Sequence, residues 1–355
     1  MTSMKKLLLT WMCLQLPALA HAAGPSSAKS ERSKAASVAP AVPVADRYAR
    51  RCQSQGSYRT NKPQGTMLWG TKRDWNTEKP TDENRSVLVS ADFEPLRQAD
   101  AGVKALKLEG SRLVTQASAT QGIVGTVLQG TDSDGKPVEI ALCGAEPSTE
   151  DPEVTWYRIE AWNAVAQEWE NPCVALDRVP DPRALAVAGV WDASGAHKAS
   201  AGKFTFACEN GAITKCIRWG YKPWASRDGQ SLADLHQACT RMARADYCGN
   251  GRSHTHQDTI IDIYDRLGVL TRTTETSSEW DPRRAAFEAA WAPDGALCLA
   301  KTRDGRAMST ILQECPDRFR TGAALELGEG DRCTVQRAGA APGKPMLRNM
   351  SYKTP

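Results

Sequence analysis

The sequence predicts an α+β protein, mainly β, that is rich in disulfides and carries a disulfide-stapled α-hairpin at about 209–248. Three observations predict this class. Two pairs of β-prone runs flank turn sequences, one segment has the apolar spacing of an amphipathic helix, and ten of the eleven cysteines lie beyond an N-terminal leader.

The first 22 residues have the pattern of an export signal. Lys5 and Lys6 precede an apolar run over residues 7–19, and Ala20 and Ala22 stand one residue apart as in a small-x-small cleavage site. The run is too short to span a bilayer. We therefore expect a cleaved leader at 1–22 and a mature chain that is periplasmic or extracellular, without a transmembrane anchor.

The cysteine count then suggests disulfides. Removing Cys13 with the leader leaves an even number, which in an oxidising compartment predicts five bridges. The candidates are Cys52, Cys143, Cys173, Cys208, Cys216, Cys239, Cys248, Cys298, Cys315 and Cys333.

Composition divides the rest of the chain. Residues 23–46 are rich in Ala, Ser and Pro and predict a disordered linker, because such a stretch buries too little apolar surface to offset its ordering entropy. Residues 334–355 look similar and predict a flexible basic tail. Between them we expect a β-rich segment at 47–120 and a larger domain at 121–333.

The charge of the chain gives no sign of a nucleic-acid partner. The net charge is +4, but the leader, the linker and the tail all carry basic residues in excess. The body that remains is mildly acidic and has no footprint for backbone phosphates.

Two segments predict β-hairpins. GIVGTVLQGTDSDGKPVEIALCG, at 122–144, places β-prone runs on either side of Asp-Ser-Asp-Gly. FEAAWAPDGALCLAKTR, at 287–303, does so around Pro-Asp-Gly. For the second segment the alanines also allow a helix over 284–291. VTWYRIEAW, at 154–162, alternates as a strand does.

The clearest helix is SLADLHQACTRMARADYCG, at 231–249. Ser231 is a natural N-cap, Asp234 suits the positive end of the helix dipole, and Gly249 can supply a left-handed stop. One apolar stripe recurs at three- and four-residue steps: Leu232, Leu235, Cys239 and Met242.

A shorter helix is expected at 209–220, with Asn210 as cap and Gly220 as stop. Two such helices would form a hairpin stapled by nested bridges, Cys216–Cys239 inside and Cys208–Cys248 outside. The rival pairing joins the cysteines within each helical segment. Two helical turns, about 12 Å, separate those partners, which is beyond the reach of a disulfide.

Several runs in this order resemble bacterial ADYC-domain proteins, a family that takes its name from the letters at Ala245–Cys248. The runs are TWYRIEAWNAVAQEWENPC, GVWDASGAHK, FTFACENGAITKCIRWGYKPW, DLHQACTRMARADYCGNGRSHT and IIDIYDRLG. The similarity covers roughly 122–315 and is most specific at 204–265. It implies an exported, cysteine-rich protein and supplies no catalytic residue.

The segment ADYCGNGRSHTHQ concentrates reactive residue types. Cys248 could act as a nucleophile with His254 or His256 as base and Asp246 as its orienting partner. An even cysteine count and the turn-like Cys-Gly-Asn-Gly favour a disulfide at Cys248 instead, so we assign no catalytic residue.

The same segment raises the question of a metal. His254 and His256 could present two imidazoles, with His236 and Asp258 as further candidate ligands for zinc. His-x-His alone is a weak signal, and structural histidines are commoner, so the sequence indicates no cofactor.

The tryptophans support either a binding face or a core. Six of them gather in one half of the body, where exposed rings would stack on sugars or anchor a protein. Core packing is the commoner use. They are Trp156, Trp162, Trp169, Trp191, Trp219 and Trp224.

These features predict an exported, non-enzymatic binding or interaction module with a protein or glycan partner outside the cytoplasm. The alternative is a hydrolase or metal-dependent enzyme that acts on envelope or extracellular polymers, with its site near His236, His254 and Asp258.

Overall fold

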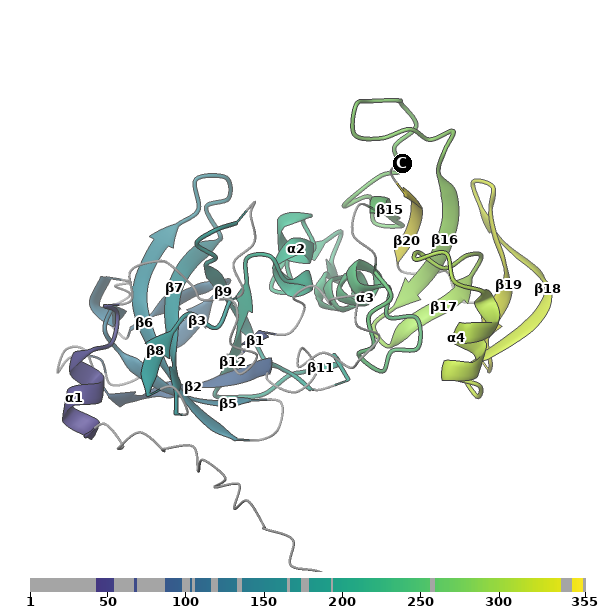
Figure 1. Ribbon diagram of the computed structural model, residues 1–355. Coiled ribbons are helices and arrows are strands. Elements are labelled where there is room, and N and C mark those ends of the chain that lie inside the picture. Colours follow the sequence, from purple (N-terminus) through teal and green to yellow (C-terminus); the bar gives the residue numbers. More distant parts are fainter. Residues whose placement is uncertain are drawn as a thin grey trace, which may run out of the picture. The chain divides into compact units, whose positions relative to one another are not determined.

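The computed structural model describes residues 43–53, 67–68, 87–97, 103, 106–115, 121–132, 136–164, 167–173, 179–192, 194–255, 259–339 and 347–353. In these ranges strands outnumber helices, and most strands belong to two sheets with a helical pair between them in the sequence (Figure 1). The predicted α+β, mainly β, disulfide-rich class is confirmed.

The first sheet closes on itself. Its order is β1-β2-β12-β9-β7-β6-β5, and β2 also pairs with β5, which makes a six-stranded barrel with β1 and β8 attached outside the ring. The strands are β1 (Met67–Leu68), β2 (Val87–Arg97), β5 (Val127–Asp132), β6 (Pro137–Pro147), β7 (Thr155–Asn163), β8 (Glu168–Glu170), β9 (Ala184–Ala188) and β12 (Lys203–Cys208). The predicted hairpin at 122–144 is β5–β6.

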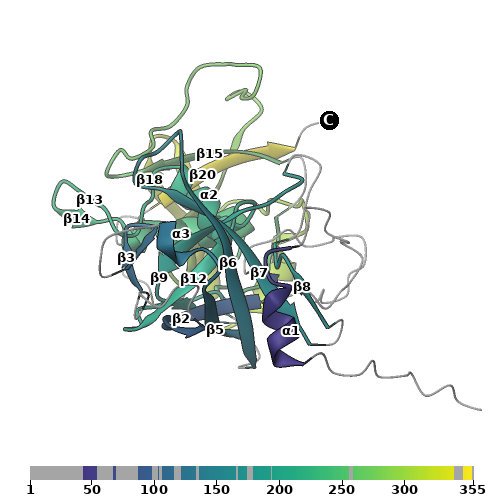
Figure 2. The same cartoon turned by 90° about the vertical axis from the view of Figure 1, so that its left-hand side faces the viewer.

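Short elements decorate the barrel. They are α1 (Val44–Ala49), β3 (Lys107–Glu109), β4 (Arg112–Val114), η2 (Gln121–Ile123), β10 (Val190–Trp191) and β11 (His197–Lys198). Helix α1 lies beside β7 and β8 (Figure 2), and its Tyr48 packs there in one cluster with Trp162 and Trp169.

Both faces of β7 are buried, although its sequence alternates. Tyr157 and Ile159 point into the barrel core with Phe204 and Phe206 of β12. On the outer face, Trp156 packs in a second cluster together with the first helix of the α-hairpin. A strand covered on both sides loses the polar-out pattern of a solvated sheet.

The α-hairpin is confirmed. It consists of α2 (Ala212–Arg218) and α3 (Ala233–Arg244), with the small hairpin β13 (Ser226–Arg227) and β14 (Gln230–Ser231) between them, and Cys216–Cys239 joins the two helices.

Three helix ends in the structure differ from those that the sequence predicts. Gly211 rather than Asn210 precedes α2, and Leu232 rather than Ser231 precedes α3, although the Ser231 hydroxyl accepts the N–H of Ala233 at 3.2 Å. Helix α3 ends at Ala245 in the left-handed conformation, four residues before Gly249.

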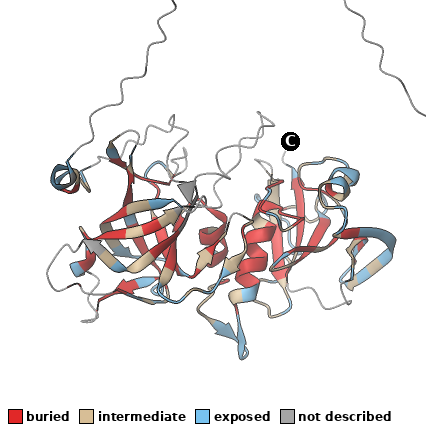
Figure 3. Cartoon of the chain, turned by 90° about the horizontal axis from the view of Figure 1, so that it is seen from below, coloured by how far each residue is buried: buried red, intermediate tan, exposed pale blue. Residues whose placement is uncertain are grey.

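The second sheet is antiparallel, in the order β15-β20-β16-β17-β19-β18, and α3 packs on it. Its elements are β15 (Thr259–Asp265), β16 (Ala286–Ala292), β17 (Gly295–Leu299), β18 (Phe319–Gly328), β19 (Asp331–Arg337) and β20 (Leu347–Lys353), with α4 (Met308–Glu314) before β18. The hairpin predicted at 287–303 is β16–β17, so the helical alternative over 284–291 is wrong. Buried residues line the strands of both sheets (Figure 3).

The prediction of a flexible tail at 334–355 is wrong for its described residues. Strand β19 continues to Arg337, and β20 lies between β15 and β16 (Figure 1). The strand escaped prediction because its inward positions include Asn349 and Ser351, which are buried although they are polar. An apolar/polar period cannot reveal a strand of this kind.

The nested disulfide prediction is half right. Cys216–Cys239 forms, but Cys208–Cys248 is wrong: Cys208 pairs with Cys173, and Cys248 pairs with Cys315. Cys208 ends β12 and belongs to the barrel core, whereas Cys248 lies in the core of the second sheet. The remaining bridges are Cys52–Cys143 and Cys298–Cys333.

The expected segment boundaries also change. Strand β2, from the predicted segment 47–120, lies between β5 and β12 of the predicted domain 121–333, so the two share one sheet. Helix α1 begins at Val44, inside the predicted linker 23–46. The predicted leader at 1–22 and the linker up to residue 42 lie outside the described residues. None of the described helices combines the length and the hydrophobicity that a membrane-spanning helix requires.

A chain truncated after Arg337 tests the role of β20. We expect loss of cooperative unfolding, because removing a strand between β15 and β16 exposes the core on both sides. Thermal melting followed by circular dichroism measures this. A chain truncated after Lys353 is the control, and a Tm within a few degrees of the full chain for both truncations would contradict the assignment.

Candidate functional site

The four residues after α3, Ala245–Cys248, form a buried turn. Ala245 has φ 51°, its N–H donates to the Met242 carbonyl at 2.9 Å, and the N–H of Asp246 donates to the Arg241 carbonyl at 2.9 Å. These two bonds make the Schellman ending that glycine usually provides. The left-handed conformation costs an L-residue about 1–2 kcal/mol, and burial of the alanine methyl in the core offsets part of that strain.

Asp246 holds the turn together from inside. It is fully buried, and its Oδ2 lies 2.5 Å from Nη1 of Arg241. Its Oδ1 accepts the N–H of Asn250 at 3.1 Å, and its Oδ2 accepts the N–H of Gly251 at 3.0 Å. A carboxylate with these donors stabilises the loop and has no access to a substrate.

Arg241 and Gly249 connect this turn to its surroundings. The Arg241 guanidinium donates to the carbonyl of Ser194, in the loop between β10 and β11, and to that of Pro293 at 3.1 Å, in the β16–β17 turn. A Cβ on Gly249 would lie 1.9 Å from the Asp294 carbonyl oxygen, so only glycine permits this approach of two backbones.

Tyr247 enters a second buried network. Its hydroxyl donates to Glu288 Oε1 at 3.1 Å and accepts the N–H of Arg303 at 2.7 Å, and its ring stacks on Trp291 with centroids 5.4 Å apart. Arg303 forms a fork with Glu288 at 3.0 and 2.8 Å, and Asn349 Nδ2 donates to Glu288 Oε2 at 3.0 Å.

The electrostatics of this network follow from burial. Burial raises the pKa of Tyr247 well above its usual value, which keeps the phenol protonated and able to donate. Burial alone would raise the pKa of Glu288, but the charge and hydrogen bonds of Arg303 outweigh it and hold the pKa below its usual range. Both charged side chains are completely inaccessible to solvent. The network is therefore structural.

Cys248 has no free thiol, because it forms the bridge to Cys315. Beside that bridge, His254 Nε2 lies 2.9 Å from Glu314 Oε2, and Nδ1 lies 3.1 Å from the Ala245 carbonyl oxygen. Burial alone would raise the pKa of Glu314, but the contact with His254, the charge of Arg252 and the hydrogen bond from Asn250 together outweigh it, and the pKa is lowered. Both ring nitrogens of His254 therefore face protein oxygens, and these two contacts fix the orientation of the imidazole.

His236 is the buried structural histidine that the sequence favoured. Its Nε2 lies 3.1 Å from the Ile213 carbonyl oxygen, its ring meets Trp191 edge-on, and burial lowers its pKa to about 4. His236 and His254 thus have separate protein partners. The other two metal candidates, His256 and Asp258, lie outside the described residues, so a zinc site that includes them stays a prediction.

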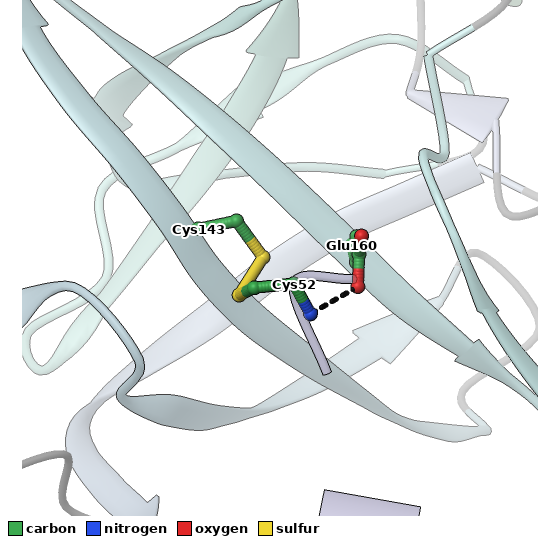
Figure 4. A group of neighbouring side chains, drawn as sticks. All are labelled: Cys52, Cys143 and Glu160. Carbon is green, nitrogen blue, oxygen red and sulfur yellow. Dashed lines mark hydrogen bonds between the residues drawn. A yellow bond between two sulfur atoms is a disulfide. The ribbon is translucent and has the colours of Figure 1, made fainter. Parts of the chain in front are cut away.

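Within the described residues, one group brings three potential ligand atoms within 4.8 Å of one another: Cys52, Cys143 and Glu160 (Figure 4). The two sulfurs are bonded to each other and are not thiolates, which zinc would need. Glu160 Oε2 accepts the N–H of Cys52 at 2.6 Å, where Cys52 has φ 61°. The group therefore anchors the end of the α1 segment to β6 and β7.

A small surface pocket of about 160 Å³ lies at the end of the barrel beside α2. No local motif predicted it, because its residues come from positions up to 72 apart in the sequence and meet only in the fold; of them, the sequence singled out only Trp156. Its lining includes Glu146, Glu150, Trp156, Arg183, Glu209 and Arg218.

The tryptophans serve the core. Trp156, Trp162, Trp169 and Trp191 are buried, and Trp219 and Trp224 are partly buried. Core packing, the commoner interpretation, is confirmed for the four buried rings, while Trp219 and Trp224 pack at the edges of the core clusters and Trp156 also lines the pocket.

Glu288→Gln tests the buried network. Gln cannot neutralise Arg303, so we expect the free energy of unfolding to fall by about 3–5 kcal/mol. The control Asp181→Asn breaks the exposed Arg158–Asp181 pair, and we expect a loss of about 0–1 kcal/mol. Urea unfolding measures both, and equal losses would show that the network carries no special share of the stability.

The lowered pKa of His236 predicts a pH dependence. The unfolded chain takes up this proton near pH 6.5, whereas the native chain takes it up near pH 4. Stability from this group is therefore complete above pH 6.5 and declines by roughly 3 kcal/mol as the pH falls to 4. His236→Gln, which keeps a donor for Ile213, should lack this decline in urea unfolding measured at pH 4–7. An unchanged slope would contradict the assignment.

Comparison with known proteins places the turn in a family. The family model of the ADYC domain matches residues 120–305, which is more than half of the chain and includes α2, α3 and the pocket. No curated protein and no solved structure matches the sequence. With this match over five strands of the barrel, β5, β6, β7, β9 and β12, and over the α-hairpin and the buried turn Ala245–Cys248, the chain belongs to the ADYC-domain family.

Proposed function

We propose that the protein is an exported, disulfide-stabilised binding module and that its ligand site is the pocket beside α2. Two features support export: the leader-like first 22 residues, and five bridges that use every cysteine beyond the leader. Disulfides persist in oxidising compartments, which makes the periplasm or the cell exterior the expected location.

Binding is favoured over catalysis because the described residues with reactive chemistry are committed to the fold. Cys248 is bridged, Asp246 holds a turn, and His236 and His254 bond to protein acceptors. The enzymatic alternative near His236, His254 and Asp258 gains no support from a described contact.

The observation that carries the proposal is the pocket itself. Arg183 covers the ring of Trp156 at 4.6 Å and is fixed by Glu209, so this part of the lining is preorganised, while Glu150 and Arg218 add exposed charges. Preformed concave sites with a few converging polar groups are the usual location of small-ligand binding.

The test uses the full chain produced with its leader in a bacterial host. We expect recovery outside the cytoplasm, and alkylation of ten cysteines only after reduction. In ¹⁵N NMR, amino acids, short peptides or saccharides should shift the Trp156 indole signal and leave that of Trp162, beside α1, unchanged. Free thiols, cytoplasmic retention, or no shift at Trp156 from any class would overturn the proposal.

A further inference from the structure

We propose that the pocket beside α2 binds a free α-amino acid, and a basic one in preference to an acidic one, by exchanging partners with the Glu150–Arg218 pair. This inference rests on the proposed binding function. It follows from a difference between two charge pairs in one pocket, of which one is fixed and the other is free to open.

The fixed pair is Arg183 with Glu209. Arg183 donates to Glu209 through Nε at 3.2 Å and Nη2 at 3.0 Å, and its backbone N–H also donates to Glu209 at 3.2 Å. Nη1 bonds Glu146, and the guanidinium covers Trp156. A ligand would have to break several contacts to displace Arg183, so this side chain stays in place as a wall.

The second pair, Glu150 with Arg218, is held by one long contact. Arg218 Nη2 lies 3.4 Å from Glu150 Oε2, and the two side chains are 47 % and 73 % exposed. The loop that carries Glu150 is nevertheless held in place, because Lys222 Nζ bonds Asp151 and Glu153, each at 2.7 Å. The two head groups can therefore separate while their backbones stay fixed.

An α-amino acid matches this arrangement because its ammonium and its carboxylate are attached to the same carbon. The Glu150 and Arg218 head groups are likewise neighbours, with 3.4 Å between Oε2 and Nη2. Its carboxylate can accept from Arg218, and its ammonium can donate to Glu150. One long contact is thereby replaced by two charge-assisted hydrogen bonds. Both ligand charges contribute, because a ligand with only one can form only one of these two bonds.

The volume and the net charge of the pocket indicate which amino acids fit it. A pocket of about 160 Å³ lies below the ~300–1,000 Å³ typical of drug-sized ligands and suits a single residue. Three carboxylates and two guanidiniums line it, so it carries a net negative charge. Glu146, which is 59 % exposed and contacts Arg183, can accept a second cation. The side chain is therefore expected to be basic.

Isothermal titration calorimetry on the full mature chain tests this with five probes: L-lysine, L-glutamate, Nα-acetyl-L-lysine, L-lysine amide and glucose. We expect lysine to bind at least tenfold more tightly than the other four. Lysine should also shift the Trp156 indole signal, because that ring lies under Arg183.

Two variants assign the contacts. Glu150→Gln should weaken lysine at least tenfold and leave Nα-acetyl-L-lysine, which has no α-ammonium, within twofold. Arg218→Gln should weaken lysine at least tenfold and leave lysine amide within twofold, and Arg218→Lys should restore part of the loss. The control Arg158→Gln, in an exposed pair outside the pocket, should change none of these affinities by more than twofold. Unchanged Tm values show that the variants fold.

The outcomes separate the two proposals. Equal affinity for lysine and Nα-acetyl-L-lysine, or tighter binding of glutamate, would overturn the amino-acid inference. If glucose or another saccharide shifts Trp156 and no amino acid does, this inference falls and the binding function stands. If no probe or ligand class shifts Trp156, both proposals fall.

Discussion

The second sheet depends on one buried ion pair, Glu288 with Arg303. Burying two charges is favourable only if every lone pair and proton finds a partner. Here each oxygen of Glu288 has two donors: Tyr247 and Arg303 on one, Arg303 and Asn349 on the other. These donors come from the turn after α3, the segment after β17, and β20. All three segments must therefore be in place together, because any absent one leaves a charge unsatisfied in the core.

The same constraint explains which parts of the fold the sequence could reveal. Features set by neighbours in the chain were predictable: the β5–β6 and β16–β17 hairpins, the body of α3, and the bridge Cys216–Cys239 between adjacent helices. Strand β20 was not predictable. Its Asn349 is buried because it hydrogen-bonds Glu288 and Trp291, and a polar residue at a buried position breaks the apolar pattern that would indicate a strand. The partners of Cys208 and Cys248 were missed because Cys208 ends β12 in the barrel core, whereas Cys248 follows the left-handed Ala245 into the core of the second sheet.

The candidate site shows a similar division. The sequence correctly located a dense cluster of chemistry at 245–254, and the even cysteine count correctly argued against a nucleophile at Cys248. The sequence could not show that Asp246, Tyr247 and His254 all form hydrogen bonds within the protein, with partners between 5 and 60 residues away. Nor could it find the pocket, because Glu150, Arg183 and Arg218 become neighbours only when β6, β9 and α2 meet at one end of the barrel.

The degree to which a charge is satisfied decides whether it serves the fold or a ligand. Glu288 has four donors and no solvent contact, so exchanging a partner there would expose an unpaired charge in the core. Arg218 shares one long contact with an exposed glutamate, and water can replace that partner at little cost. A charge pair can accept a ligand only if separating its two side chains costs little free energy and the backbone of both residues stays in place. In the described part of the pocket, Glu150 and Arg218 meet both conditions, because Lys222 fixes the loop while the head groups remain free to separate.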